Sequence, residues 1–199
     1  MNKIKNTIAF FDFDGTITTK DTMIQLIIKI FGYQKYFLSL LQLSPFLLAL
    51  KLKIISNQNA KQRLLKYFFK DMTVHYFDEI CNRYITDYIH FIINEEAINK
   101  IKWHKKKNHQ IVVVSASIEN WVRPWCEMHN LLFIATKLEV SNEKITGNLS
   151  TKNCYGPEKV NRIKELFDLN NFSNIYAYGD SVGDKEMLEI ADFGYYKNF

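Results

Sequence analysis

The sequence contains few of the residues that build disulfide frameworks or that mark disordered chains. Its 199 residues include 3 cysteines, 7 glycines and 3 prolines, and they show no low-complexity tract or internal repeat. Cys81, Cys126 and Cys154 are odd in number and far apart, which argues against a disulfide framework and against a zinc site. We therefore expect an ordered globular protein in a reducing compartment.

The N-terminal stretch also lacks the pattern of a signal peptide, so we expect no secretion. The first residues, MNKIKNTIAFFDFDG, reach acidic side chains before the apolar core of a signal peptide could be completed. Together with the cysteine pattern, this predicts a cytoplasmic protein.

Acidic residues are absent from residues 29–70, although the net charge of the whole chain is only +5. The basic residues of that stretch are Lys29, Lys35, Lys51, Lys53, Lys61, Arg63, Lys66 and Lys70. Within it, residues 36–50 (YFLSLLQLSPFLLAL) carry no charge, but this run is too short and too broken by Pro45 for a membrane span. Two interpretations remain open: the buried side of a helical bundle, or a segment that contacts anionic lipid at the inner face of the membrane.

Short apolar runs alternate with helical patterns over much of the chain. Residues 7–12, 110–115 and 174–179 are bounded apolar runs typical of buried strands, and residues 95–107 and 157–167 have helical patterns. This alternation predicts an α/β fold with a parallel, Rossmann-like sheet covered by helices.

Two further segments do not fit a simple alternation. Residues 138–149 predict a peripheral hairpin near the sheet edge. Nearly a hundred residues separate the first two predicted strands, far more than one crossover helix needs. Helix-rich segments at 21–31, 34–54, 58–70 and 74–93, punctuated by Gly32, Pro45 and Ser56-Asn57, predict a helical-bundle cap. We expect a catalytic core of residues 1–20 and 95–199 and a cap of residues 21–94.

The stretch FFDFDGTITTKD sets two carboxylates at the end of the first predicted strand. Asp12 and Asp14 are two residues apart, so on an extended backbone both side chains leave the same face. A hard cation such as Mg²⁺ would neutralise their repulsion, and an aspartate can accept a phosphoryl group. The alternative is a pair of turn-forming or helix-capping aspartates.

Polar residues follow the other predicted strands or begin a helix. Ser115 ends the second apolar run, where it could bind an anion or cap a helix. Lys159 lies near a helix start, where a cation opposes the helix dipole unless it faces a bound phosphoryl group. Asp180 and Asp184 follow the third run, where they could complete a metal site or cap a helix. Because these positions meet at the carboxyl ends of parallel strands, the sequence predicts one ligand-binding crevice.

In this order, DFDGT at 12–16, Ser115, Lys159 and GDSVGD at 179–184 resemble the motifs of the haloacid dehalogenase superfamily. The helical insertion resembles its phosphoserine-phosphatase-like branch. The resemblance covers roughly 120 residues of the core in four blocks.

The resemblance implies a phosphatase that forms an aspartyl-phosphate on Asp12. It implies that Asp14 protonates the leaving oxygen and then activates water, and that Ser115 and Lys159 hold the phosphoryl oxygens. Mg²⁺ would be bound by the Asp12 carboxylate, the Asp14 carbonyl and Asp180, with Asp184 supporting the metal shell.

The substrate stays open at this point. Asp21 is a substrate-binding candidate, but it stands where phosphoserine-hydrolysing members carry Glu, and Ala116 and Ser117 replace a glycine pair. A small metabolite phosphate and a lipid phosphate are both compatible, and the apolar, basic cap resembles that of phosphatidylglycerophosphate phosphatases. A phosphotransferase and a non-catalytic phosphate-binding scaffold are further alternatives. The basic run at residues 100–110 is typical of a solvated helix end, so we expect no nucleic-acid partner.

Overall fold

The computed structural model describes residues 6–52 and 54–197. Five parallel strands form the central sheet in the order β3-β2-β1-β6-β7. Their bounds are β1 Asn6–Phe11, β2 Gln110–Ile118, β3 Leu132–Thr136, β6 Phe172–Gly179 and β7 Phe193–Tyr196. The predicted α/β fold with a parallel sheet is therefore confirmed. Strand β1 lies at the centre, with β2 on one side and β6 on the other.

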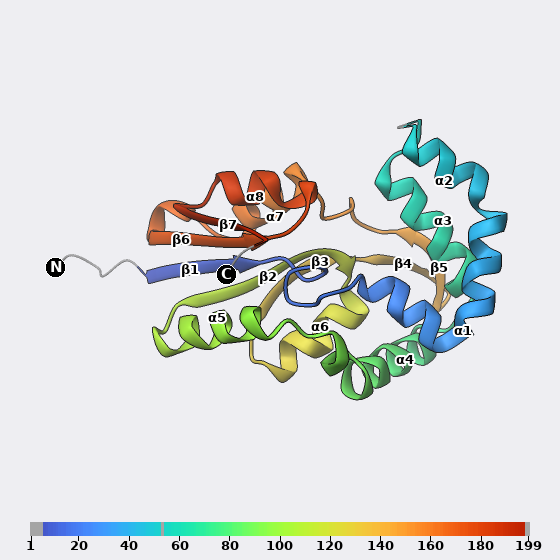
Figure 1. Cartoon of the computed structure of the whole chain (residues 1–199), viewed down its shortest axis with the longest axis horizontal. Helices are drawn as coiled ribbons and strands as arrows, with labels where there is room; N and C mark the ends of the chain where they lie inside the picture. The colour runs from blue at the N-terminus through green and yellow to red at the C-terminus, as the bar shows by residue number, and fades with distance from the viewer. Residues whose placement is uncertain (1–5, 53, 198–199) are drawn as a thin grey trace.

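Helices cover both faces of this sheet (Figure 1). One face carries α5 (Glu95–Lys106) and α6 (Glu119–Met128), and the other carries α7 (Pro157–Leu166) and α8 (Lys185–Glu189). Two apolar clusters fill the layers. The larger cluster continues from the core into the cap, whereas the smaller one lies under α7 and α8. Both faces of the sheet are buried, which is why its central strands are near-continuous apolar runs.

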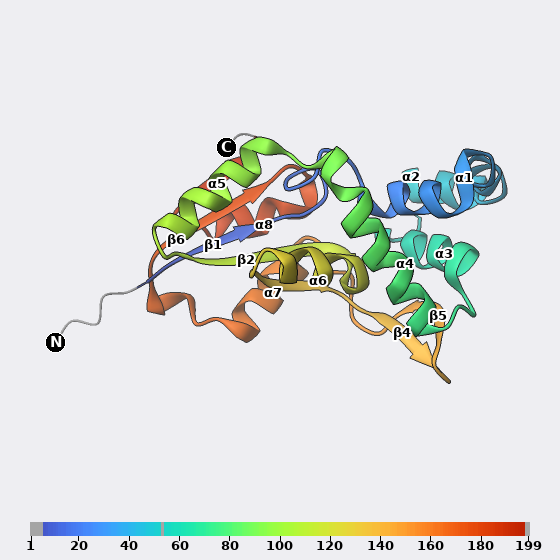
Figure 2. The same cartoon turned by 90° about the horizontal axis from the view of Figure 1, so that it is seen from below.

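Between β1 and α5, four helices and a short 3-10 turn stand to one side of the sheet (Figures 1 and 2). We call them the cap helices: α1 (Thr22–Gln42), α2 (Ser44–Lys51), α3 (Asn57–Phe69), α4 (Val74–Asp87) and η1 (Ile89–Ile92). Asp21, Ser56 and Thr73 cap α1, α3 and α4, each by accepting a hydrogen bond from a first-turn backbone N–H. Gly32 bends α1 through a backbone conformation with φ of 80°.

The hairpin predicted at 138–149 is present and follows the edge strand β3, but it is not part of the central sheet. Strands β4 (Leu138–Ser141) and β5 (Lys144–Leu149) form a separate two-stranded sheet that packs against α3 (Figure 1). Its backbone is hydrogen-bonded to the turn between α3 and α4: Asp71 N donates to Ile145 O, and Ile145 N donates to Met72 O. The hairpin therefore supports the cap, because its free edge pairs with the chain leaving α3.

A buried histidine on α5 joins the sheet to that helix. His104 Nε2 lies 3.0 Å from the Tyr178 hydroxyl, and its Nδ1 lies 2.8 Å from His109 Nδ1. The ring is completely buried, and this burial lowers the pKa of His104 to about 3.

His104 should make the protein less stable in mild acid. The unfolded chain takes up its proton near pH 6.5, whereas the folded protein resists it down to about 3. The contribution of the neutral, buried His104 to the free energy of unfolding is therefore complete above pH 6.5. It is lost as the pH falls toward 3, by at most about 1.4 kcal/mol per pH unit. Urea unfolding at pH 4.5, 5.5 and 7.5 should show a shallower pH dependence for His104→Gln. The exposed His75→Gln serves as the control, and equal slopes for all three proteins would contradict the assignment.

No helix among residues 6–52 and 54–197 is long and apolar enough to cross a membrane.

Candidate active site

The end of β1 positions Asp12 at the centre of the sheet. Asp12 N donates to Tyr178 O of β6 at 2.9 Å, so the backbone is still paired to the sheet where the side chain begins. The strand order reverses here, because β1 is followed in sequence by β2 on one side while β6 lies on the other. Such a switch point opens a crevice at the carboxyl ends of the strands. The Asp12 side chain lies in that crevice and is buried.

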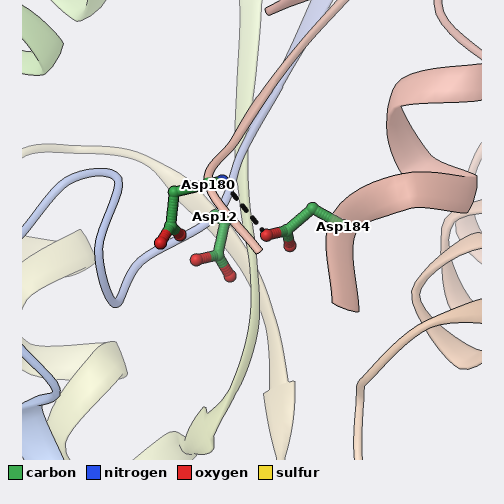
Figure 3. A group of neighbouring side chains, drawn as sticks. All are labelled: Asp12, Asp180 and Asp184. Atoms are coloured by element: carbon green, nitrogen blue, oxygen red, sulfur yellow. Dashed lines mark hydrogen bonds between the residues drawn. The ribbon is translucent and has the colours of Figure 1, made fainter. Parts of the chain in front are cut away.

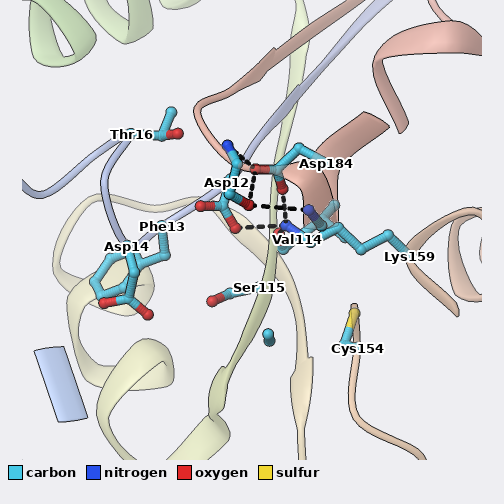
Figure 4. Close-up of polar contacts among 12 residues, drawn as sticks. Asp12, Phe13, Asp14, Thr16, Val114, Ser115, Cys154, Lys159 and Asp184 are labelled. Atoms are coloured by element: carbon cyan, nitrogen blue, oxygen red, sulfur yellow. Dashed lines mark hydrogen bonds and ion pairs between the residues drawn. The ribbon is translucent and has the colours of Figure 1, made fainter. Parts of the chain in front are cut away.

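Lys159, near the start of α7, is the buried cation of the site. Its Nζ lies 2.5 Å from Asp12 Oδ1 and 2.6 Å from Asp184 Oδ1, and it donates to Val114 O at 2.6 Å (Figure 4). Burial by itself would lower the pKa of Lys159, but the two carboxylates outweigh it and raise that pKa. Burial raises the pKa of Asp12 to about 8, although Lys159 acts in the opposite direction. The ammonium is fixed by three acceptors and stays protonated.

Asp12, Asp180 and Asp184 form an acidic cluster (Figure 3). One carboxylate oxygen from each lies within 4.8 Å of the others. Burial and the charge of Asp184 raise the pKa of Asp180. Burial also opposes ionisation of Asp184, but Lys159 and hydrogen bonds from Ser181 hold the pKa of Asp184 below its usual value. The Lys159 ammonium pairs with two of these three carboxylates, so the cluster can accept further positive charge.

The loop after β1 is shaped around the same cluster. Gly15 has φ of +84°, and a Cβ on it would lie 2.3 Å from Asp180 Oδ2. Thr16 Oγ1 donates to Asp180 Oδ1 at 3.3 Å. Hard carboxylate oxygens at this spacing are the donor set that Mg²⁺ prefers, so the residues fit such an ion. The close approach of the two loops explains why the Asp-x-Asp pair is followed by glycine.

Asp14 lies apart from the acidic cluster, and its carboxylate is held from two sides. Oδ1 accepts a hydrogen bond from Thr22 N, the first residue of α1, at 2.6 Å. Oδ2 accepts one from the Ser117 hydroxyl. The cluster of carboxylates that could hold a metal does not include the Asp14 side chain. The cap and β2 together therefore orient this carboxylate.

Strand β2 runs three residues farther than predicted, so Ser115 is not the cap of the following helix. Ile118 occupies that position and makes no side-chain cap. The pairing of β2 with β3 shifts between Val114 and Ile118, and Ser115 to Ser117 occupy this irregularity. Ser115 is buried, lines the crevice and accepts a hydrogen bond from Ser117 N at 2.9 Å.

The remaining candidate, Asp21, lies at the outer part of the crevice. It is exposed, and its Oδ1 caps α1 by accepting from Ile24 N at 2.9 Å. Asp21 also lines the crevice, so capping and substrate contact are compatible at this position.

Several polar residues of the crevice were not identified from the sequence, among them Lys61 and Asn153. Lys61 of α3 donates to Ala116 O at 2.7 Å and to Asn153 Oδ1 at 2.9 Å. Burial lowers the pKa of Lys61. No local motif marks either residue, since Lys61 is one basic residue among eight in its stretch. Lys61 and Asn153 reach the crevice because α3 packs over the end of β2 and over the segment that precedes α7.

These groups surround a cavity of about 280 Å³. The predicted site residues that line it are Asp12, Asp14, Asp21, Ser115, Lys159 and Asp184. Asp180 joins them through the acidic cluster. Residues that are up to 172 positions apart in the chain, Asp12 and Asp184, thus meet at one edge of the sheet.

Comparison with known proteins agrees with this architecture. The family model for haloacid dehalogenase-like hydrolases matches residues 9–189. Protein CicA of Caulobacter vibrioides is 30% identical over 194 residues, covering 95% of this chain and 85% of CicA. The 2-hydroxy-3-keto-5-methylthiopentenyl-1-phosphate phosphatase of Bacillus cereus is 25% identical over 204 residues, covering 96% of this chain and 83% of that enzyme.

The fold is also similar to that of a solved phosphoserine phosphatase. A structure described as its phospho-aspartyl intermediate analogue superimposes with a TM-score of 0.66, at 22% identity, over 95% of this chain and 84% of that one. The match of the family model over most of the sequence confirms the family inferred from the motifs. The chain belongs to the haloacid dehalogenase-like hydrolase family.

Proposed function

We propose that this protein is a Mg²⁺-dependent phosphomonoester hydrolase that works through an aspartyl-phosphate on Asp12. The single observation that carries the proposal is the buried Lys159 ammonium, which bridges the carboxylates of Asp12 and Asp184. Because a transferring phosphoryl group carries negative charge, its catalysis depends on positioning and on charge neutralisation. A fixed cation beside an aspartate at the end of β1 provides both.

The side chains divide the reaction between two groups. A carboxylate oxygen of Asp12 attacks phosphorus, and the bond to the ester oxygen breaks as Asp14 donates a proton to that oxygen. Asp14 then takes a proton from the water that hydrolyses the acyl phosphate. Lys159 and the Ser115 hydroxyl bind the phosphoryl oxygens. Mg²⁺ bound by Asp12, Asp180 and the Asp14 carbonyl, with Asp184 supporting them, would supply further neutralising charge.

Removal of the metal tests this proposal directly. Release of para-nitrophenol from its phosphate ester should fall roughly 10²-fold or more with excess chelator and should recover when Mg²⁺ is restored. Mg²⁺ should also raise the free energy of unfolding, by about 2.7 kcal/mol at a hundred times its dissociation constant.

Two variants give that measurement its control. Asp180→Asn should lose most of the Mg²⁺-dependent stabilisation, whereas Asp87→Asn, exposed at the end of α4, should retain it. Turnover that is indifferent to chelation would overturn the metal dependence.

A location at an anionic lipid surface is a second proposal, favoured by the outside of the cap. Tyr33, Phe37 and Leu41 are exposed along one side of α1 at a spacing of four residues. Residues 29–70 add basic residues and no acidic ones, although Lys53 lies outside the described residues. An apolar helix face with basic neighbours is typical of interfacial binding.

Sedimentation with vesicles tests this location. The protein should sediment with anionic vesicles at low salt and less so at high salt, and Phe37→Asp should weaken the binding. Equal sedimentation with neutral and anionic vesicles, or none with either, would refute the proposed surface.

A further inference from the structure

We call the cavity of about 280 Å³ around Asp12 and Lys159 the catalytic cavity. Beside it, the cap contains an apolar chamber of about 300 Å³. Its wall includes Tyr36 and Leu40 of α1, Phe46 and Leu50 of α2, and Leu64 of α3. The uncharged run at 36–50 therefore has two sides: these residues face the chamber, while Phe37, Leu41 and other members of the run are exposed. The inner side is not closed by packing, because the half-buried side chains surround open volume.

The chamber adjoins the catalytic cavity. Met23, Asn57 and Lys61 line both of them. The aliphatic part of Lys61 belongs to the chamber wall, and its ammonium reaches Ala116 O and Asn153 Oδ1 on the catalytic side. A ligand with its phosphate beside Asp12 would therefore have to pass Lys61 to reach the chamber.

The residues that line the chamber indicate which chemical group of a ligand would bind there. Within the described part of the chain, its charged lining residues are Lys61 and Arg63, and none is acidic. The Arg63 guanidinium lies 3.6 Å from the centre of the Phe46 ring, so it covers an apolar surface at this point. The other lining side chains are mostly apolar. They bind apolar groups and provide few hydrogen-bond partners for water.

We propose that the substrate is an amphiphilic phosphomonoester whose phosphate occupies the catalytic cavity and whose hydrocarbon chain occupies this chamber. This inference rests on the proposed hydrolase function and names its substrate class. An apolar cavity of about 150 Å³ accommodates benzene, so the chamber has room for on the order of ten carbon atoms. Hydrolysis by itself is unchanged: the ester bond breaks, water supplies the oxygen, and the products are phosphate and a long-chain alcohol.

A series of alkyl phosphates tests the proposal. Hydrolysis of butyl, hexyl, octyl and decyl phosphate is measured in Mg²⁺, below the concentrations at which they form micelles. Each buried methylene should raise kcat/KM by about threefold, giving a rise on the order of 10³-fold over the six methylenes from butyl to decyl phosphate. Calorimetric binding of butyl- and decylphosphonate without metal gives a second readout that does not depend on turnover.

Variants of the chamber show whether the chain binds there. Ala60→Phe fills the chamber and Leu40→Asn makes its wall polar, so each should reduce the decyl-to-butyl ratio at least tenfold. Leu38→Asn, at an exposed position of α1 that does not line the chamber, should retain the ratio. Having both a filling and a polar variant keeps the test valid if one of them fails to fold.

The outcomes separate this inference from the function beneath it. If aryl phosphate is hydrolysed with Mg²⁺ but the rate does not depend on the length of the alkyl chain, the amphiphilic substrate is refuted and the proposed hydrolase function is retained. Absence of hydrolysis of any ester would overturn both. A rise with chain length that persists in Ala60→Phe and Leu40→Asn would place the chain elsewhere and also refute the proposal. A parallel arm with phosphatidic acid in phosphatidylcholine vesicles distinguishes a membrane lipid from a free amphiphile as the source of the phosphate.

Discussion

Asp12→Asn should reduce turnover of an aryl phosphate on the order of 10⁴-fold or more, because an amide oxygen cannot form the acyl phosphate. Asn has the same shape as Asp and can still accept the hydrogen bond from Lys159 Nζ, so the fold should be preserved. Rapid acid quenching with ³²P-labelled substrate should find label on the wild-type protein and none on the variant.

The same substitution should leave the metal-free protein at least as stable as the wild type. Burial raises the pKa of Asp12 to about 8, so folding at pH 7 disfavours the ionised carboxylate that the unfolded chain prefers. This cost is greatest at and above neutral pH and vanishes below about pH 4, where both states are protonated. Asn removes it, while Lys159 keeps Asp184 and Val114 O as partners. We expect a higher free energy of unfolding than that of the wild type at pH 7 and no difference at pH 4.

Asp87→Asn is the matched control, since this carboxylate is exposed and distant from the acidic cluster. It should change neither turnover nor the phosphorylated fraction. If the Asp12 variant keeps wild-type turnover, Asp12 is not the nucleophile. If it is instead strongly destabilised at pH 7, the ion pair outweighs the cost of burial.

Lys159→Met should affect both turnover and stability. The variant removes the cation that neutralises Asp12 and Asp184, which are both buried. Removing one partner of a buried ion pair typically costs about 3–5 kcal/mol, and losing one phosphoryl-binding donor should cost on the order of 10²–10³ in turnover. Urea unfolding and steady-state kinetics measure the two effects. Mg²⁺ should recover part of the stability, because it neutralises the same carboxylates.

Lys185→Met provides the comparison for this experiment. Lys185 is exposed and pairs with Glu189 at 3.7 Å on the surface of α8. Its loss should alter the unfolding free energy by no more than about 0.5 kcal/mol. If Lys159→Met and Lys185→Met lose similar stability, burial of the Lys159 ion pairs does not explain the loss in Lys159→Met.

The core strands were predictable because each is a short apolar run between polar turns. The runs at 110–115 and 174–179 begin within two residues of the observed strands, and only the end of β2 was misjudged. Its serine-rich end has no apolar pattern, and the sheet extends it by pairing Ile118 with Thr136 of β3. The outer strands β3 and β7 were not identified. β7 has 4 residues, too few for an alternating pattern to be recognised.

The motif residues of the candidate site could be read from the sequence because their chemistry depends on residue type and on local spacing. Asp12 and Asp14 must leave one end of a strand together, and glycine must follow them where the Asp180 loop approaches. Lys61 and Asn153 had no such signal. Their contact depends on α3 lying across the ends of strands that are distant in sequence.

The sequence alone determined the parallel sheet, the helical insertion and the acidic residues that gather at the end of β1. Those features follow from apolar periodicity and from strand ends, which are local properties of the chain. Only the tertiary structure decided that the hairpin supports the cap, that Lys61 borders the catalytic cavity, and that residues 36–50 divide between a chamber wall and an exposed surface. A helix with apolar residues on most sides has no single inner face in its sequence, so the packing of its neighbours alone selects which side becomes enclosed.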